Sequence, residues 1–384
     1  MAALKEITVF CEQGDSSKLK TWSNVPYFLT ATLEASGVKV NRVSLHPGSS
    51  VAEKIFYKLW NVWVKGVTRR KGCPYRRSSA YFYLMERKVR AAVRKYADSD
   101  AFLFTSYSMS SKKYSDKPSV LFCDWTAEYD LLHAHGRKIE ELPSYDVRFM
   151  QRQKEVIEGA DAVVCLFPGV TEHMRKVYPQ ARIHYIGNVV NSLEEPVVPE
   201  TIERKEKGHD ILFVGKKHYM KGARELLAAF SLLRTENPEL RLHIIGLTES
   251  QLGQLPEGVT CYGYLDKSDT AQRRIYYDLL SSCRLFVNTT PQWGAFSASV
   301  EAMYHYMPVL VTPYGEFVKT FGAEIGFGLY HDENGGERVL AEEIKALLEP
   351  KGFREKAECA HAMVADMKWD RYVSRLTNII EKMI

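Results

Sequence analysis

Three lysines lie between two glycines in the segment Gly215 to Gly222, after an apolar run and before a stretch with helical spacing. The apolar run predicts a strand, and Ala223 to Arg234 predicts an amphipathic helix. A loop that enters a helix presents free backbone N–H groups, and Lys216, Lys217 and Lys221 add positive charge to them. The segment therefore predicts a diphosphate-binding site. A solvated basic turn has the same composition, and the loop has neither the Walker spacing nor the G-x-G-x-x-G fingerprint.

A second stretch, Leu285 to Met303, has the same order of predicted strand, loop and helix, but without the lysines. It begins with a short apolar run, breaks at a Pro-Gln-Trp-Gly turn, and continues as small residues with helical character. Small residues let a ligand approach the backbone closely, and the first turn of a helix attracts an anion. We therefore expect an anion such as a phosphate to bind the backbone N–H groups of Gly294, Ala295, Phe296 and Ser297.

The single acid of this stretch, Glu301, predicts a different contact. A carboxylate is repelled by phosphates, so its useful partners are the hydroxyl groups of a sugar, as in the acidic residues that bind ribose in dinucleotide-binding folds. The basic loop, the helix N-terminus and the ribose acceptor together indicate a nucleotide diphosphate. An ordinary strand–loop–helix unit is the plain alternative for each part alone.

These stretches belong to an alternation of apolar strands and helices that extends along the whole chain and predicts an α/β fold with two doubly wound, Rossmann-like domains. The first domain is expected at residues 1–192 and the second at 209–362. Residues 193–208 are rich in proline and charge and predict a linker. Residues 363–384 have an apolar face at helical spacing and predict a terminal helix that must bury this face. The expected strands are residues 7–11, 38–45, 101–104, 119–123, 160–169, 182–192, 209–215, 240–246, 259–265, 285–289 and 307–313.

The net charge of +5 is unevenly distributed. Residues 60–96 contain eleven Lys or Arg and one acid, Glu86, so the remaining chain is net negative. Tryptophan and tyrosine are interleaved with these basic residues, which is typical of a membrane-surface or polyanion patch. A solvated helix face whose aromatic residues pack inward is the alternative. We expect no nucleic-acid binding, because no recognised binding motif accompanies the charge.

The seven cysteines are scattered without a CxxC pair or clustered histidines, which argues for a reducing compartment and against a structural zinc. The N-terminus lacks a signal-peptide apolar core, and no apolar run is long enough to span a membrane. We therefore expect a cytoplasmic protein, at most peripheral at the inner face of a membrane, without a metal site.

Four segments resemble a known family, the retaining glycosyltransferases of family 4, which have the GT-B architecture. ILFVGKKHYMKGARELLAAF resembles its basic strand–loop–helix motif, with Lys216 where arginine is usual. VEAMYHYMPVLVTPYGEF resembles its Glu-Ala-Met motif, which makes Glu301 the second acid of an E-x7-E signature. IGNVVNS resembles the end of the family's first domain, and the terminal helix at Trp369 is similar to one that crosses back to that domain.

The resemblance implies two domains facing a cleft, and transfer of a sugar from a nucleotide-diphosphate donor to a glycan or lipid-linked acceptor with retention of configuration. No cofactor is implied. Lys216 and Lys221 would stabilise the departing diphosphate beside Gly215. Tyr262 and Tyr264 are candidates for the base of the nucleotide. In the first domain, catalytic Asp124 and the loop residues Trp22, Ser23 and Asn24 would face the acceptor or the sugar.

One residue departs from the family pattern. Trp293 occupies the position of the first acid of the E-x7-E signature, which contacts the donor sugar in this family. Two further classes therefore stay open. One is a sugar-nucleotide epimerase with the same architecture, and the other is a non-catalytic member that binds a nucleotide or glycan.

Overall fold

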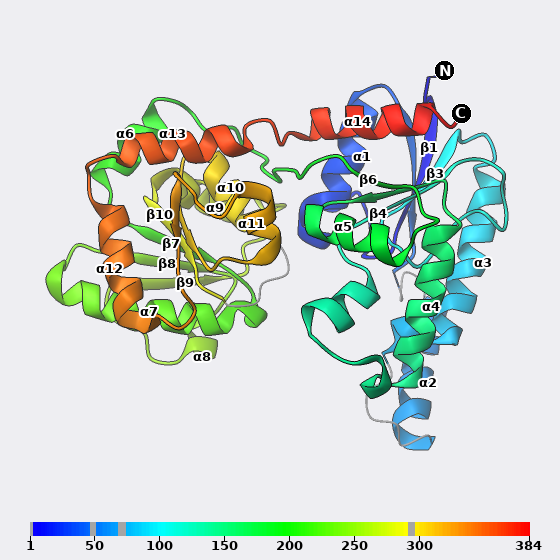
Figure 1. The fold of residues 1–384 in the computed structure, drawn as a ribbon, viewed down its shortest axis with the longest axis horizontal. Helices are drawn as coiled ribbons and strands as arrows, with labels where there is room; N and C mark the ends of the chain where they lie inside the picture. Colours follow the sequence, from blue (N-terminus) through cyan, green and yellow to red (C-terminus); the bar gives the residue numbers. More distant parts are fainter. Residues whose placement is uncertain (1–2, 47–50, 68–73, 291–295) are drawn as a thin grey trace. The chain divides into compact units, whose positions relative to one another are not determined.

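The computed structural model describes residues 3–46, 51–67, 74–290 and 296–384. Contacts divide the chain into two compact units, unit 1 with Met1–Asn188 and Trp369–Ile384, and unit 2 with Val189–Lys368. Each unit has a six-stranded, entirely parallel sheet with helices packed on it (Figure 1). The predicted α/β fold with two doubly wound domains is confirmed.

The sheet of unit 1 has the strand order β2-β1-β3-β4-β5-β6. The direction of winding reverses between β1 and β3, so the loops that leave these strands separate and open a crevice at the carboxyl edge. The strands are β1 Glu6–Cys11, β2 Lys39–Ser44, β3 Ala101–Phe104, β4 Ser119–Cys123, β5 Ala162–Cys165 and β6 Ile183–Tyr185. The helices are α1 Val25–Ala35, α2 Val51–Val62, α3 Ser79–Lys95, α4 Ser144–Glu158, α5 Pro168–Val177 and α14 Trp369–Glu381, with short turns at Trp22–Asn24, Tyr75–Arg77 and Ile139–Glu141 and π-helical segments at Trp63–Val67 and Tyr129–Ala134.

Helix α14 packs on α1, and the two chain ends lie close together in this unit (Figure 1). The ring of Trp369 stacks on that of Phe28 with centroids 6.2 Å apart, and Tyr372 contacts Phe122 of β4. The backbone N–H of Leu4 donates to the Glu381 carboxylate at 3.0 Å. The apolar face that the sequence shows in this helix is thus buried within unit 1.

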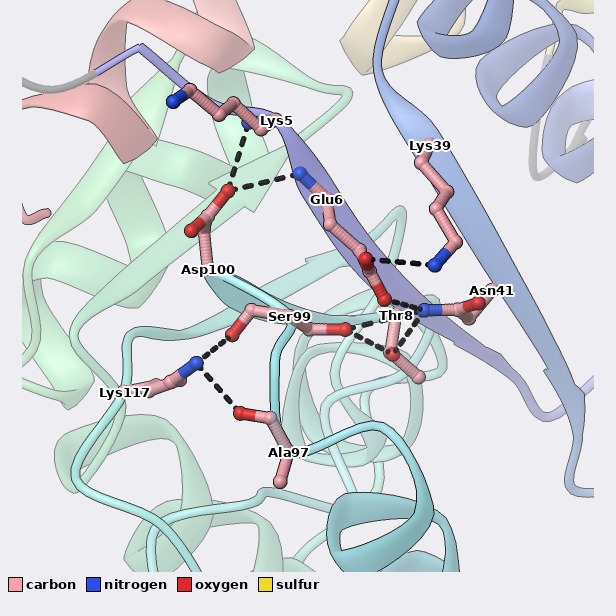
Figure 2. Close-up of polar contacts among 9 residues, drawn as sticks. All are labelled: Lys5, Glu6, Thr8, Lys39, Asn41, Ala97, Ser99, Asp100 and Lys117. Carbon is pink, nitrogen blue, oxygen red and sulfur yellow. Dashed lines mark hydrogen bonds and ion pairs between the residues drawn. The ribbon is translucent and has the colours of Figure 1, made fainter.

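The amino-terminal edge of this sheet is held by a polar cluster (Figure 2). Asp100 accepts hydrogen bonds from the backbone N–H groups of Lys5 and Glu6 at 2.8 and 2.9 Å. Asn41 donates to Glu6 at 2.7 Å. Lys117 donates to the carbonyl oxygens of Ala97 and Ser99, at 2.7 and 2.6 Å. These bonds fix the turn before β3 against β1 and β2.

The sheet of unit 2 has the order β12-β11-β10-β7-β8-β9, so its winding reverses between β7 and β10. The strands are β7 Ile211–Val214, β8 Leu242–Ile245, β9 Val259–Gly263, β10 Leu285–Asn288, β11 Val309–Val311 and β12 Gly328–Tyr330. The helices are α6 Glu200–Lys207, α7 Met220–Glu236, α8 Glu249–Leu252, α9 Thr270–Ser282, α10 Ser297–Tyr304, α11 Gly315–Phe321, α12 Gly336–Leu348 and α13 Phe353–Val364, with a short turn η6 at Lys217–Tyr219.

Alternation along β7 explains how helices cover both faces of this sheet. Ile211 and Phe213 are fully buried in one hydrophobic cluster with Phe230 of α7 and Ile344 of α12. The intervening Leu212 is also fully buried and points to the opposite face. Both faces are therefore apolar, as expected for a parallel strand covered on two sides.

The stretch predicted as a linker, 193–208, contains helix α6, which is a correction. Its Ile202 and Lys205 are buried, and the Lys205 ammonium donates to backbone carbonyl oxygens at Leu280 and Cys283 in and after α9. The sequence obscured this because the buried surface of so short a helix includes a lysine. No helix in the described part of the chain is long and apolar enough to cross a bilayer.

Candidate active site

The lysine segment lies at the carboxyl end of β7, on one side of the reversal in the sheet of unit 2. Helix α7 begins at Met220, three residues earlier than the sequence predicts, so Lys221 and Gly222 belong to its first turn. The residue before the helix, Tyr219, makes no side-chain cap. The carbonyl oxygen of Lys217 in the preceding turn accepts the N–H of Met220, so this end of α7 offers a ligand mainly the positive end of the helix dipole.

Close backbone contacts hold this loop in place. A Cβ atom on Gly222 would lie 2.6 Å from the backbone nitrogen of Thr290, so only glycine lets α7 approach the loop after β10. Gly246 has a φ of +96°, and its Cβ would lie 2.4 Å from the carbonyl oxygen of Gly215. The loops after β7, β8 and β10 thus meet at one edge of the sheet.

Lys216, Lys217 and Lys221 are exposed on this edge. None of the three forms a hydrogen bond or an ion pair with another residue in the described ranges; the ammonium of Lys216 lies 5.4 Å from the ring centroid of Tyr264. Burial, and then the charge of Lys216, lower the pKa of the neighbouring His218. Three cations without carboxylate partners at a helix N-terminus suit a ligand with several negative charges.

Glu301 is held differently from the expectation. It is 3% exposed, and its carboxylate accepts two hydrogen bonds from the Lys267 ammonium at 2.7 and 2.8 Å. The hydroxyls of Tyr276 and Tyr277 donate to it at 2.8 and 3.1 Å. Burial, followed by the charge of Glu301, raises the pKa of both tyrosines, so both remain protonated donors. Since a carboxylate has about four acceptor sites, a ribose must displace one of these donors.

The sequence did not reveal Lys267, Tyr276 and Tyr277 as partners of Glu301. Tyr277 also accepts the backbone N–H of Leu193 at 2.7 Å, so the network joins α9, α10 and the start of unit 2. The one available signal was a pair of tyrosines on the buried face of α9, and that pattern equally predicts simple core packing.

Of the two tyrosines predicted to contact the base, only Tyr264 lies at the lysine edge. The Tyr262 hydroxyl bonds Nδ1 of His243 at 2.9 Å, and Nε2 of His243 lies 3.2 Å from Asp210, directly before β7. Tyr262 therefore points to the amino-terminal edge of the sheet, and its assignment to the base is corrected. The pairing of β8 with β9 skips Tyr262, and Gly263 has a φ of 63°, so regular strand alternation does not extend from Tyr262 to Tyr264.

The second anion-binding stretch is described only in part. Gly294 and Ala295, and with them Trp293, lie outside the described residues. Helix α10 begins at Ser297 after Phe296, without a side-chain cap. Phe296 is buried against the rings of Phe317 and Phe321, so its side chain anchors the start of the helix. The backbone of this first turn remains the predicted phosphate contact.

The predicted residues of unit 1 come together at the carboxyl edge of its sheet. Trp22, Ser23 and Asn24 have positive φ values of 38°, 53° and 71°, a conformation that is costly for residues other than glycine. Burial raises the pKa of Asp124, while hydrogen bonding, including that to the side chain of Trp22, opposes the increase. The amide of Asn24 donates to the carbonyl of Leu19. The strain is thus concentrated in the loop that brings Trp22 to Asp124.

Unit 1 also contains a pair that the sequence did not suggest. Nε2 of His173 bonds the Glu128 carboxylate at 2.6 Å, and the His133 ring lies 4.8 Å from that of His173. Among the described residues no group of three or more His, Cys, Asp or Glu is arranged to hold a metal ion.

Comparison with known proteins finds a family match for part of the chain. Residues 208–350 match the family described as glycosyl transferases group 1. The matched segment lies in unit 2 and includes Lys216, Lys221 and Glu301. No curated protein matches the chain.

Solved structures resemble the whole chain. Sucrose-phosphate synthase from Thermosynechococcus elongatus is 15% identical, covers 98% of both chains and has a TM-score of 0.66. WaaG, a glycosyltransferase involved in lipopolysaccharide biosynthesis, is 16% identical over 97% of this chain and 99% of its own, with a TM-score of 0.65. HepE from Anabaena, solved with UDP-glucose, is 15% identical over 98% of both chains, with a TM-score of 0.62. These similarities show that the fold is of the GT-B type.

Proposed function

We propose that this protein is a glycosyltransferase that moves a sugar from a nucleotide-diphosphate donor to a glycan or lipid-linked acceptor, with retention of configuration. The observation that carries the proposal is the set of three exposed, unpaired lysines at the N-terminus of α7, beside the winding reversal of a sheet that matches a glycosyl transferase family. The geometry favours a diphosphate because the positive end of the α7 dipole and the three ammonium groups lie at one edge of the sheet.

In this proposal the bond between the anomeric carbon and the diphosphate oxygen breaks, and the acceptor hydroxyl forms the new bond to that carbon. The leaving diphosphate gains negative charge, which Lys216 and Lys221 stabilise. The N–H groups of Gly294, Ala295, Phe296 and Ser297 bind the donor phosphates. Asp124 is assigned to the acceptor hydroxyl, because burial raises its pKa and favours proton uptake.

The base would stack near Tyr264, which lies beside Lys216. Glu301 would bind the ribose by exchanging one of its present donors, Lys267 or a tyrosine hydroxyl, for a ribose hydroxyl. Trp22, Ser23 and Asn24 form the acceptor side. A cytoplasmic location stays a prediction from the sequence.

A calorimetric titration of the full chain with UDP-, GDP- and ADP-glucose tests the donor assignment. We expect one nucleotide to bind with a Kd in the micromolar range and Lys221→Ala to weaken that binding. Failure of all three to bind would remove a sugar-nucleotide site.

Because Trp293 replaces the acid that contacts the donor sugar in the resembling family, two alternative functions stay open. They are a sugar-nucleotide epimerase and a non-catalytic binding protein. Incubation with the bound sugar nucleotide, with and without a glycan acceptor, separates them by product. An epimerised sugar nucleotide in the absence of acceptor identifies the first, and unchanged donor under both conditions identifies the second.

A further inference from the structure

Helix α2 has apolar residues on two opposite sides. On one side Phe56, Tyr57 and Trp60 pack around Tyr75, with ring centroids 6.2, 5.2 and 6.1 Å from that of Tyr75. This contact attaches α2 to the turn before α3. This packing explains the aromatic residues on one side of α2 but not the apolar residues on the opposite side.

The other side carries Val51, Ile55, Leu59 and Val62, which are 73%, 54%, 62% and 69% exposed. Their spacing places them on one face of a helix, so they form a continuous apolar stripe with no cover among the described residues. Lys54 and Lys58 are exposed, form no ion pair with a described residue, and lie next to this stripe in the helical arrangement. In Figure 1 α2 extends at the lower end of unit 1, beyond α3 and α4.

A pocket of about 520 Å³ lies beside α2. Trp60 and Trp63 form part of it with Phe82 and Phe149, and three arginines, Arg77, Arg148 and Arg152, contribute charge. Its lining contains a single acid, Glu155. The pocket therefore combines aromatic walls with a net positive charge.

Two buried donors of this lining have no acceptor. Nε1 of Trp60 and Nε of Arg152 are both inaccessible to solvent and make no hydrogen bond to a described residue. Arg77 pairs with Asp146 and the terminal nitrogen of Arg152 with Glu86, whereas Arg148 is exposed and has no acidic partner in the described ranges. The free guanidinium of Arg148 favours an anionic ligand, and phosphate oxygens can accept several hydrogen bonds from such a lining.

We propose that α2 and this pocket dock the protein on an anionic phospholipid bilayer. Val51, Ile55, Leu59 and Val62 enter the boundary between headgroups and acyl chains. Lys54 and Lys58 remain at headgroup level, and a headgroup phosphate binds in the pocket at Arg148. An amphipathic helix with flanking lysines is the geometry that binds in the plane of such an interface. The apolar contact thus comes from residues 51–62, upstream of most of the basic segment 60–96 that predicted a membrane contact, and this docking does not depend on transferase activity.

Sedimentation with vesicles tests the proposal, with phosphatidylcholine alone or with 30% phosphatidylglycerol. We expect the wild-type chain to bind the anionic vesicles at least tenfold more tightly than the neutral ones. The double variant I55E/L59E should lose at least tenfold in this binding, because it removes the stripe and adds negative charge. Arg148→Gln should weaken binding to the anionic vesicles about fivefold, the effect of one basic group near such a surface.

The double variant V339E/I275E is the matched control, since both residues are apolar and about 40% exposed in unit 2. It should bind vesicles like the wild type. Circular dichroism and nucleotide titration should be unchanged in I55E/L59E, which separates this proposal from the donor-site proposal. Equal binding of both vesicle types by the wild type, or full binding by I55E/L59E, would overturn docking. A wild-type dimer that I55E/L59E converts to a monomer, with no vesicle binding by either, would assign the stripe to a second copy.

Discussion

Charged side chains are paired at one edge of the parallel sheets and unpaired at another. At the amino-terminal edge of unit 1, Asp100, Lys39 and Lys117 are all paired within the protein (Figure 2). At the carboxyl edge of unit 2, Lys216, Lys217 and Lys221 have no carboxylate or carbonyl partner in the described ranges. The first arrangement joins strands and turns, and the second leaves charge for a ligand.

Glu301 lies between these extremes. The sequence predicts that Glu301 binds a ligand. Its carboxylate is nevertheless buried and paired with Lys267 and Tyr276, as in a network that stabilises the fold. From this comparison we expect the unpaired lysines of the α7 loop to bind a ligand, and the buried, saturated Glu301 to contribute first to stability. Substitutions at the three places should separate these effects.

Lys221→Ala should have the largest effect, on donor binding and turnover but not on stability. We expect kcat for sugar transfer to fall about 10²–10³-fold, as when one preorganised stabilising group is removed from a leaving anion. The free energy of unfolding should change by less than about 0.5 kcal/mol, because the ammonium has no partner to lose. Steady-state kinetics and urea denaturation measure the two quantities.

Lys207→Ala is the matched control for the loss of one exposed positive charge from unit 2. It should retain the activity of the wild type, and Lys221→Arg should retain more activity than Lys221→Ala. Wild-type turnover in Lys221→Ala would remove this lysine from the site.

Glu301→Gln should mainly lower stability, by about 3–5 kcal/mol, because it leaves the buried ammonium of Lys267 without a counter-charge. The double variant E301Q/K267M should recover much of the loss, since both charges are then removed. Urea denaturation checks both, and equal stability of Glu301→Gln and wild type would show that the ion pair contributes nothing.

The main features of the fold followed from local pattern. Alternating apolar runs and amphipathic helices predicted both parallel sheets, and the lysine segment was placed correctly at the end of β7 because strand, loop and helix are contiguous there. A site that is built from neighbouring residues can be predicted in this way.

Features that depend on packing between distant segments could not be predicted. Lys267 lies 34 residues before Glu301, and only the tertiary fold of unit 2 brings the segment before α9 to α10. Tyr262 and Tyr264 flank the same glycine, but Tyr262 bonds His243 of β8 while Tyr264 lies beside Lys216. The exposed apolar stripe on α2 has the spacing of any amphipathic helix. That spacing does not show whether other parts of the protein cover this face.

Asp100→Ala tests the role of the amino-terminal edge of unit 1. It removes the acceptor of two backbone N–H groups, so the free energy of unfolding should fall by about 1–3 kcal/mol. The kinetic constants for transfer at a temperature well below Tm should match the wild type, which is the reverse of the Lys221 result. A selective loss of kcat in Asp100→Ala, with unchanged stability, would contradict the division between the two edges.

The smallest effect concerns a buried charge whose state depends on pH. His331 is fully buried, with Nδ1 2.6 Å from Glu343 and Nε2 3.5 Å from Glu225. Burial lowers the pKa of His331, but the two carboxylates raise it by more, so its pKa lies above 6.5. The protonated form is thus favoured by folding, and its contribution is present below pH 6.5 and lost as pH rises through the folded pKa. Glu343→Gln removes one carboxylate, so it should be less stable than the wild type at pH 6 and approach it at pH 8. Urea denaturation at both values measures this difference, and a difference independent of pH would show that His331 is neutral throughout.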